Sequence, residues 1–165
     1  MNTATAQVLT VGLGEIHVSR EPGAVLMALG LGSCIGVALW DPQERIGGMA
    51  HVVLPAPLDE KGAKSAKFAT VAVPTLLDQV VRLGAVRRRL ICKIVGGAEV
   101  LAMSAARHNF RIGERNFEAV HAALKQEGIK VRAEDCGGKT GRSFQLAVID
   151  GRMTVKRLGR DWTEL

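Results

Sequence analysis

The sequence of 165 residues contains no tyrosine, and aromatic residues make up only 4% of it. Aromatic side chains are the platforms on which unstacked nucleic-acid bases lie, and the sequence also lacks a recognition-helix signature. These absences argue against a nucleic-acid-binding protein. The apolar residues, 47% of the chain, predict a folded globular domain with a core of Val, Leu, Ile and Ala.

Long hydrophobic runs are also missing. No apolar stretch reaches the roughly 18 residues that a membrane-spanning helix requires. The first residues, Met1 to Gln7, lack the basic start and apolar segment of a secretory signal. We therefore expect a cytoplasmic protein that does not insert into a membrane.

Cysteine is scarce, with Cys34, Cys92 and Cys136 as the only three in the chain. Three cysteines cannot all pair internally, and a cytoplasmic chain keeps its thiols reduced. No two of them have the spacing of a zinc-binding pair, and the four histidines are scattered. The sequence therefore predicts no metal site and no cofactor.

The chain carries an excess of positive charge, with a formal net charge of +6. An acidic protein surface, a nucleic acid or plain solvation of a basic surface would each satisfy this charge. The basic residues that stand out are Arg87, Arg88, Arg89, Arg107, Arg111, Arg115, Lys156, Arg157 and Arg160.

Hydrophobic patterning predicts many strands and two substantial helices that do not strictly alternate. This order is typical of a mixed-sheet α+β or layered α/β domain. No repeat or linker divides the chain, so we expect a single domain over residues 1–165. The expected strands are 14–19, 24–29, 35–40, 46–54, 90–95, 129–133, 143–149 and 153–155, and the expected helices are 70–83 and 114–126.

The motif Gly30-Leu31-Gly32-Ser33-Cys34, followed by His51, is the strongest candidate for chemistry. A neighbouring imidazole can deprotonate a thiol for attack on a carbonyl carbon and later protonate a leaving amine. The glycine-rich bend, with Gly32 and Ser33, lets backbone N–H groups approach a developing oxyanion. The alternative is that Cys34 is a packing residue, since cysteine is among the most buried residue types.

Hairpin geometry offers a way to bring Cys34 and His51 together. Asp41 and Pro42 suit the first two positions of a β-turn. A two-residue turn at Pro42 and Gln43 would place Asp41 opposite Glu44 and Cys34 directly opposite His51 on one face. A bulge near Gly47-Gly48 would shift this register.

Other motifs in the sequence are weaker evidence of function. Gly138-Lys139-Thr140 is not a phosphate-binding loop, because Ala133 occupies the position of its first glycine, so residues 137–141 are interpreted as a strand-to-strand bend. Glu134 and Asp135 are adjacent on a strand and should point to opposite faces. Cys136 could be a second reactive thiol, but no base is close in the sequence. His121 lies on an apolar helical stripe and is interpreted as a packing residue.

Several segments together closely resemble the CheD family of chemoreceptor glutamine deamidases. They occur in the family's order from about residue 12 to residue 155. The segments are Leu29 to Cys34, Met49 to Val52 with Leu54-Pro55, Lys93 to Ala98, Ile112 to Asn116, and Ala133 to Gly138 with Gly141-Arg142.

This resemblance implies a three-layer α/β fold, with Cys34 as nucleophile and His51 as its base. It also implies methyl-accepting chemotaxis receptors as protein substrates and the phosphatase CheC as a candidate regulator. We expect a monomer. The receptor glutamine would become glutamate with release of ammonia.

One departure from the family pattern affects the site. Family members often carry Thr six residues before the nucleophile as a third catalytic group, where this chain has Ala28; Phe68 also replaces a more usual hydroxylated aromatic residue. A methyl group cannot orient an imidazole by hydrogen bonding. A backbone carbonyl, the Ser33 hydroxyl or water would then take that role. The alternative is a weakened enzyme that acts as a receptor- or CheC-binding adaptor.

Overall fold

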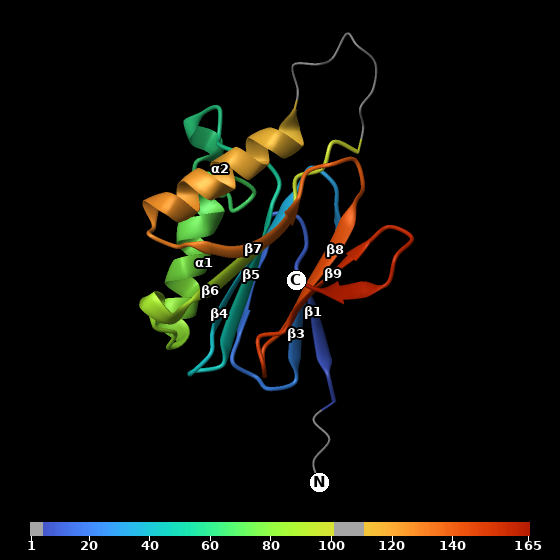
Figure 1. Cartoon of the computed structure of the whole chain (residues 1–165). Helices are drawn as coiled ribbons and strands as arrows, with labels where there is room; N and C mark the ends of the chain where they lie inside the picture. Colours follow the sequence, from blue (N-terminus) through green and yellow to red (C-terminus); the bar gives the residue numbers. More distant parts are fainter. Residues whose placement is uncertain (1–4, 101–110) are drawn as a thin grey trace.

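Strands dominate the computed structural model, which describes residues 5–100 and 111–165 (Figure 1). They form two mixed five-stranded sheets, with strand orders β1-β3-β8-β9-β10 and β2-β5-β4-β6-β7. We call these the outer sheet and the central sheet. The outer sheet contains β1 (Gln7–Thr10), β3 (Ala24–Leu31), β8 (Arg142–Ala147), β9 (Met153–Arg157) and β10 (Trp162–Glu164). The central sheet contains β2 (Ile16–Ser19), β5 (Ile46–Val52), β4 (Ile35–Asp41), β6 (Ile91–Gly96) and β7 (Val131–Cys136).

Two α-helices, α1 (Ala69–Leu83) and α2 (Ile112–Gln126), cover the face of the central sheet that points away from the outer sheet (Figure 1). Short 3₁₀ turns occur at Glu60–Gly62 and Arg87–Arg89. Among the described residues, no helix is long and apolar enough to cross a membrane. The layers therefore run helices, central sheet, outer sheet, which confirms the expected layered α/β class.

The central sheet is buried on both faces because its side chains alternate between two cores. Val37 and Leu39 of β4 pack toward the helices, together with Leu76 of α1. Ala38 and Met49 belong to the other core, which lies between the two sheets. We call this second core the inter-sheet core. It contains Val11, Ala24, Leu26, Ala28, Leu31, Ala38, Met49, Val95, Phe144, Leu146, Val148, Met153 and Val155.

The β4–β5 hairpin exists, but the register expected from the sequence is wrong. Asp41 pairs with Ile46, and His51 lies opposite Gly36, not Cys34. The turn has four residues, and the Asp41 carboxylate accepts hydrogen bonds from the N–H groups of Gln43 and Glu44, at 2.9 and 3.3 Å. The register shift is two residues, so each side chain keeps its expected face.

The expected helices and internal strands are present, with ends displaced by a few residues. The prediction missed β1 and β10, which are short edge strands with mostly exposed residues. Neither carries the alternation that marks a half-buried strand. Residues 137–141 join β7 to β8 as expected, and thereby connect the central sheet to the outer sheet.

Candidate active site

The chain crosses from the outer sheet to the central sheet through Gly32, Ser33 and Cys34, which we call the crossover loop. Three successive carbonyls of this loop are fixed. The Gly32 carbonyl accepts from the N–H of Ala98 and the Cys34 carbonyl from the N–H of Gly97, both at 2.8 Å. The Ser33 carbonyl accepts from a side-chain amide of α2 at 2.9 Å.

The N–H groups of the same loop differ from its carbonyls in their hydrogen bonding. Within the described part of the chain, no backbone acceptor is paired with the N–H groups of Gly32, Ser33 or Cys34. The loop thus directs its three carbonyls into the scaffold. This is the polarity that an oxyanion-binding loop requires.

Cys34 is partly buried and packs against the inter-sheet core. Burial raises the pKa of its thiol above the ordinary value, and the N–H of Cys34 itself offsets this effect only in part. The thiol is therefore protonated in the resting protein at neutral pH. A nucleophilic role requires a base that removes this proton.

His51, on β5, is 3% exposed. Its Nδ1 lies 3.0 Å from the carbonyl oxygen of Val11. A carbonyl can only accept, so Nδ1 carries the proton and Nε2 of the neutral ring is an acceptor. Nε2 is buried and has no partner among the described residues. The ring is thus held in the tautomer of a general base.

The loop between β1 and β2 also forms hydrogen bonds with the backbone of His51. The His51 N–H donates to the Glu15 carbonyl at 3.1 Å, and the Gly14 N–H donates to the His51 carbonyl at 3.0 Å. The Glu15 carboxylate stabilises the loop by accepting the N–H of Gly12 at 2.9 Å. Together with Val11, this loop fixes both the main chain and the ring of His51.

The structure brings Cys34 and His51 to the same layer without a hydrogen bond between them. Cys34 packs against the inter-sheet core. Along β5, the side chain of Ala50 faces the helices and that of Met49 lies in the inter-sheet core. Since side chains alternate along a strand, His51 points to the same face as Met49. Because His51 pairs with Gly36, Cys34 is its diagonal neighbour and not its opposite residue.

Ala28 lies fully buried in the inter-sheet core. Its Cβ is 3.8 Å from the point where a Cβ on Gly36 would lie, and Gly36 is the ladder partner of His51. Ala28 therefore lies beside the ladder position opposite His51. In this chain the Val11 carbonyl accepts from the ring, which selects the backbone carbonyl among the alternatives raised by the sequence.

Sequence reasoning missed Asn116, which supplies the side-chain amide that binds the Ser33 carbonyl. Its signal was a polar residue on the apolar stripe of α2, where Gly113, Val120 and Leu124 are also buried. The Val11 carbonyl had no signal in the sequence, because a backbone acceptor is independent of side-chain type.

The remaining candidates lie apart from this chemistry. His121 contacts Phe117, with ring centroids 4.4 Å apart, and its Nε2 lies 2.8 Å from the Glu134 carboxylate. Asp135 points the other way and binds Arg142 and Arg157. The opposite orientations of Glu134 and Asp135 confirm the prediction from strand alternation. Among the described residues, no cluster has the composition of a metal site.

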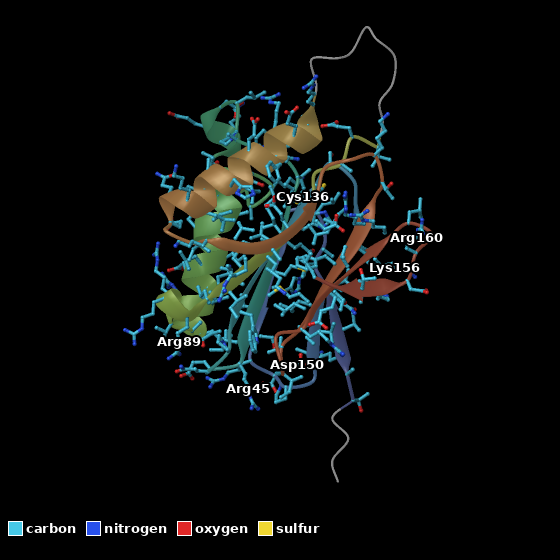
Figure 2. The ribbon with its side chains drawn as sticks, in the orientation of Figure 1. Arg45, Arg89, Cys136, Asp150, Lys156 and Arg160 are labelled. Atoms are coloured by element: carbon cyan, nitrogen blue, oxygen red, sulfur yellow. The ribbon has the colours of Figure 1, made fainter. Side chains whose placement is uncertain are left out.

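Cys136 ends β7 and pairs with Gly96 in the ladder. Burial raises the pKa of its thiol to about 12, so it is a poor nucleophile. Figure 2 shows it at the opposite end of the molecule from Arg45 and Arg89. Of the basic residues noted in the sequence, Arg107 lies outside the described residues.

Comparison with known proteins finds one family model and several relatives that carry the same family name. The family described as "CheD chemotactic sensory transduction" matches residues 53–157. The probable chemoreceptor glutamine deamidase CheD of Symbiobacterium thermophilum is 46% identical over 157 residues, covering 94% of this chain and 95% of that protein. Its namesake from Archaeoglobus fulgidus is 44% identical, covering 93% and 97%. The solved structure of hypothetical protein YfiH from Bacillus licheniformis aligns with a TM-score of 0.45 and 13% identity, over 81% of this chain and 60% of that one.

Proposed function

The chain belongs to the CheD family, and we propose that it is a chemoreceptor glutamine deamidase with Cys34 as nucleophile and His51 as general base. Its substrates are glutamine side chains of methyl-accepting chemotaxis receptors, which it converts to glutamate as part of chemotactic adaptation. The alignments with the relatives cover over nine-tenths of the chain, so they span both residues.

The observation that carries the assignment of residues is the state of His51. Its Nδ1 is occupied by the Val11 carbonyl, and its buried Nε2 has no partner among the described residues. An unpaired buried acceptor is costly, and a proton donor that approaches Nε2 would relieve this cost. A nearby protonated thiol is the group that such a nitrogen would serve.

The reaction begins when Nε2 of His51 takes the proton of Cys34 as the thiolate attacks the amide carbon of the substrate. The oxyanion forms beside the N–H groups of the crossover loop. The imidazolium then protonates the departing nitrogen, which leaves as ammonia and yields a thioester. Nε2 next removes a proton from water, the resulting hydroxide attacks the thioester, and the thiolate leaves and regains that proton.

The resting thiol and imidazole are not hydrogen-bonded, and this is compatible with the mechanism. Catalytic hydrogen bonds are often long in the free enzyme and shorten when substrate binds. Cys34 and His51 are diagonal neighbours of the same layer, a separation of roughly 7–8 Å that an aromatic or long side chain can span.

Further features of the proposal come from the sequence and from the family resemblance. They are a cytoplasmic location, a monomeric state, a CheC-type phosphatase as partner, and a catalytic core within residues 12–155. Sedimentation of the purified protein, alone and with a CheC-type phosphatase, would test the second and third of these.

The decisive experiment incubates the purified protein with the signalling domain of a receptor from the same organism and measures the mass of receptor peptides. The wild-type protein should convert glutamine to glutamate, and Cys34→Ala and His51→Ala should not. Ala28 motivates one competing function, a binding adaptor without catalysis. Equal inertness of wild type and Cys34→Ala toward a receptor that the protein binds would establish that alternative.

A further inference from the structure

Asn116 makes contacts that connect the two halves of the site. Its side chain is fully buried in the first turns of α2. The same Nδ2 donates to the carbonyl of Ser33 and to the carbonyl of Val53, each at 2.9 Å. Ser33 directly precedes Cys34, and Val53 follows His51 by two residues.

The helix that carries Asn116 is itself fixed against the strand end that holds the crossover loop. A Cβ placed on Gly113 would lie 2.5 Å from the Gly97 carbonyl oxygen and 2.7 Å from that of Ala98, so only glycine allows this approach. The N–H groups of Gly97 and Ala98 bind the carbonyls of Cys34 and Gly32. The amide of Asn116 therefore acts from a fixed support.

The chemistry of the contact requires a primary amide. An –NH₂ group offers two donors on one nitrogen, which matches two carbonyls. A carboxylate would place lone pairs against both carbonyls, and an apolar side chain would leave both without this donor. The Oδ1 of Asn116 is buried with no partner among the described residues, so the two bonds donated by Nδ2 are the hydrogen bonds that its amide makes there.

We propose that Asn116 is a positioning residue that sets the separation of Cys34 and His51 by bridging the segments that carry them. The inference rests on the proposed deamidase function. It assigns no contact with substrate to Asn116, whose effect passes through the carbonyls of Ser33 and Val53.

The test uses Asn116→Asp and Asn116→Leu in the full chain, with Val120→Ala as a matched control. Val120 is also fully buried on α2, one turn further along, and packs in the core beneath the helices. Its truncation loosens the helix without removing a bond to the crossover loop. Asn116→Ser, which keeps one donor, replaces either Asn116 variant that does not fold.

The first readout is steady-state deamidation of a receptor signalling domain. A displacement of about 1 Å in a catalytic group lowers kcat about 100-fold. We expect this loss in the Asn116 variants with KM changed by less than about threefold, and a kcat in Val120→Ala close to wild type. A kcat for Asn116→Asp within about threefold of wild type, or an equal loss in Val120→Ala at the same melting temperature, would overturn the proposal.

The second readout does not depend on the substrate. The rate of Cys34 alkylation by iodoacetamide against pH reports the ionisation of the thiol, which depends on how the crossover loop is held. The midpoint in Asn116→Leu and Asn116→Asp should shift away from the wild-type value, whereas Val120→Ala should keep the wild-type midpoint. A wild-type midpoint in Asn116→Asp refutes the positioning role. Should the wild-type protein prove inert on receptors, the deamidase function fails, and these midpoints still decide whether Asn116 positions Cys34.

Discussion

Replacing Gly96 by alanine should displace Cys34, the proposed nucleophile. Gly96 ends β6 with a φ of +126°, a conformation that L side chains rarely adopt. A Cβ at this position would lie 2.1 Å from the carbonyl oxygen of Cys34 and 3.1 Å from its carbonyl carbon. These are backbone atoms, so no rotation of a side chain can relieve the collision.

The size of the effect follows from these distances. Contacts of a real Cβ essentially never fall below 3.0 Å, so Cys34 or the end of β6 must move by about 0.9 Å. A shift of that size should lower kcat about 100-fold. The left-handed φ adds about 1–2 kcal/mol of strain, which lowers the melting temperature by roughly 2–8 °C in a chain of this length.

Gly128→Ala is the matched control. Gly128 follows α2 with a φ of +69°, and a Cβ there would meet nothing within 4 Å. This variant should show similar strain and a wild-type kcat. Thermal unfolding followed by circular dichroism measures the first quantity, and mass spectrometry of receptor peptides measures the second. A folded Gly96→Ala protein with wild-type kcat would refute the steric reasoning.

Three further predictions concern other parts of the molecule. Iodoacetamide at pH 8 should label Cys34 before Cys92 and Cys136, whose pKa values burial raises to about 12; peptide mapping that finds equal labelling contradicts this. Burial opposes ionisation of Asp41, but hydrogen bonds led by Arg89 lower its pKa to about 2. Asp41→Asn should therefore lower the free energy of unfolding by about 2 kcal/mol above pH 4. Denaturant titrations should show this difference shrinking toward pH 2, and a difference of the same size at pH 2 contradicts the prediction. Ala28→Thr should change kcat by less than threefold, because the imidazole already has an acceptor, and should lower stability by about 1 kcal/mol through overpacking. A tenfold gain in kcat would instead indicate a weakened wild-type enzyme.

The order of strands and helices could be predicted because each internal element carries its own hydrophobic pattern. The register of the β4–β5 hairpin could not. Asp41 and Pro42 are compatible with both a two-residue and a four-residue turn. The choice depends on bonds that Asp41 makes outside the turn, to the N–H of Val86 at 2.7 Å and to Arg89 at 2.9 Å. Such distant partners are invisible in a local turn signature.

The candidate site was predictable to a different extent for each residue. Cys34 and His51 stand out because their side chains have distinctive chemistry. Asn116 is marked in the sequence only as a polar residue on an apolar helical stripe, and its partners are carbonyls 83 and 63 positions away in the chain. The Val11 carbonyl, 40 residues from His51, belongs to the main chain and could be identified only from the fold.

The proposed catalytic residues and their supports come from all three layers of the fold, and this determines when the protein becomes active. Val11 follows a strand of the outer sheet, His51 belongs to the central sheet, and Asn116 comes from the helical layer. No layer alone contains the proposed machinery, so a nascent or partly unfolded molecule has none. Specific activity should therefore count fully native molecules, and immature chains should leave the glutamines of surrounding proteins untouched.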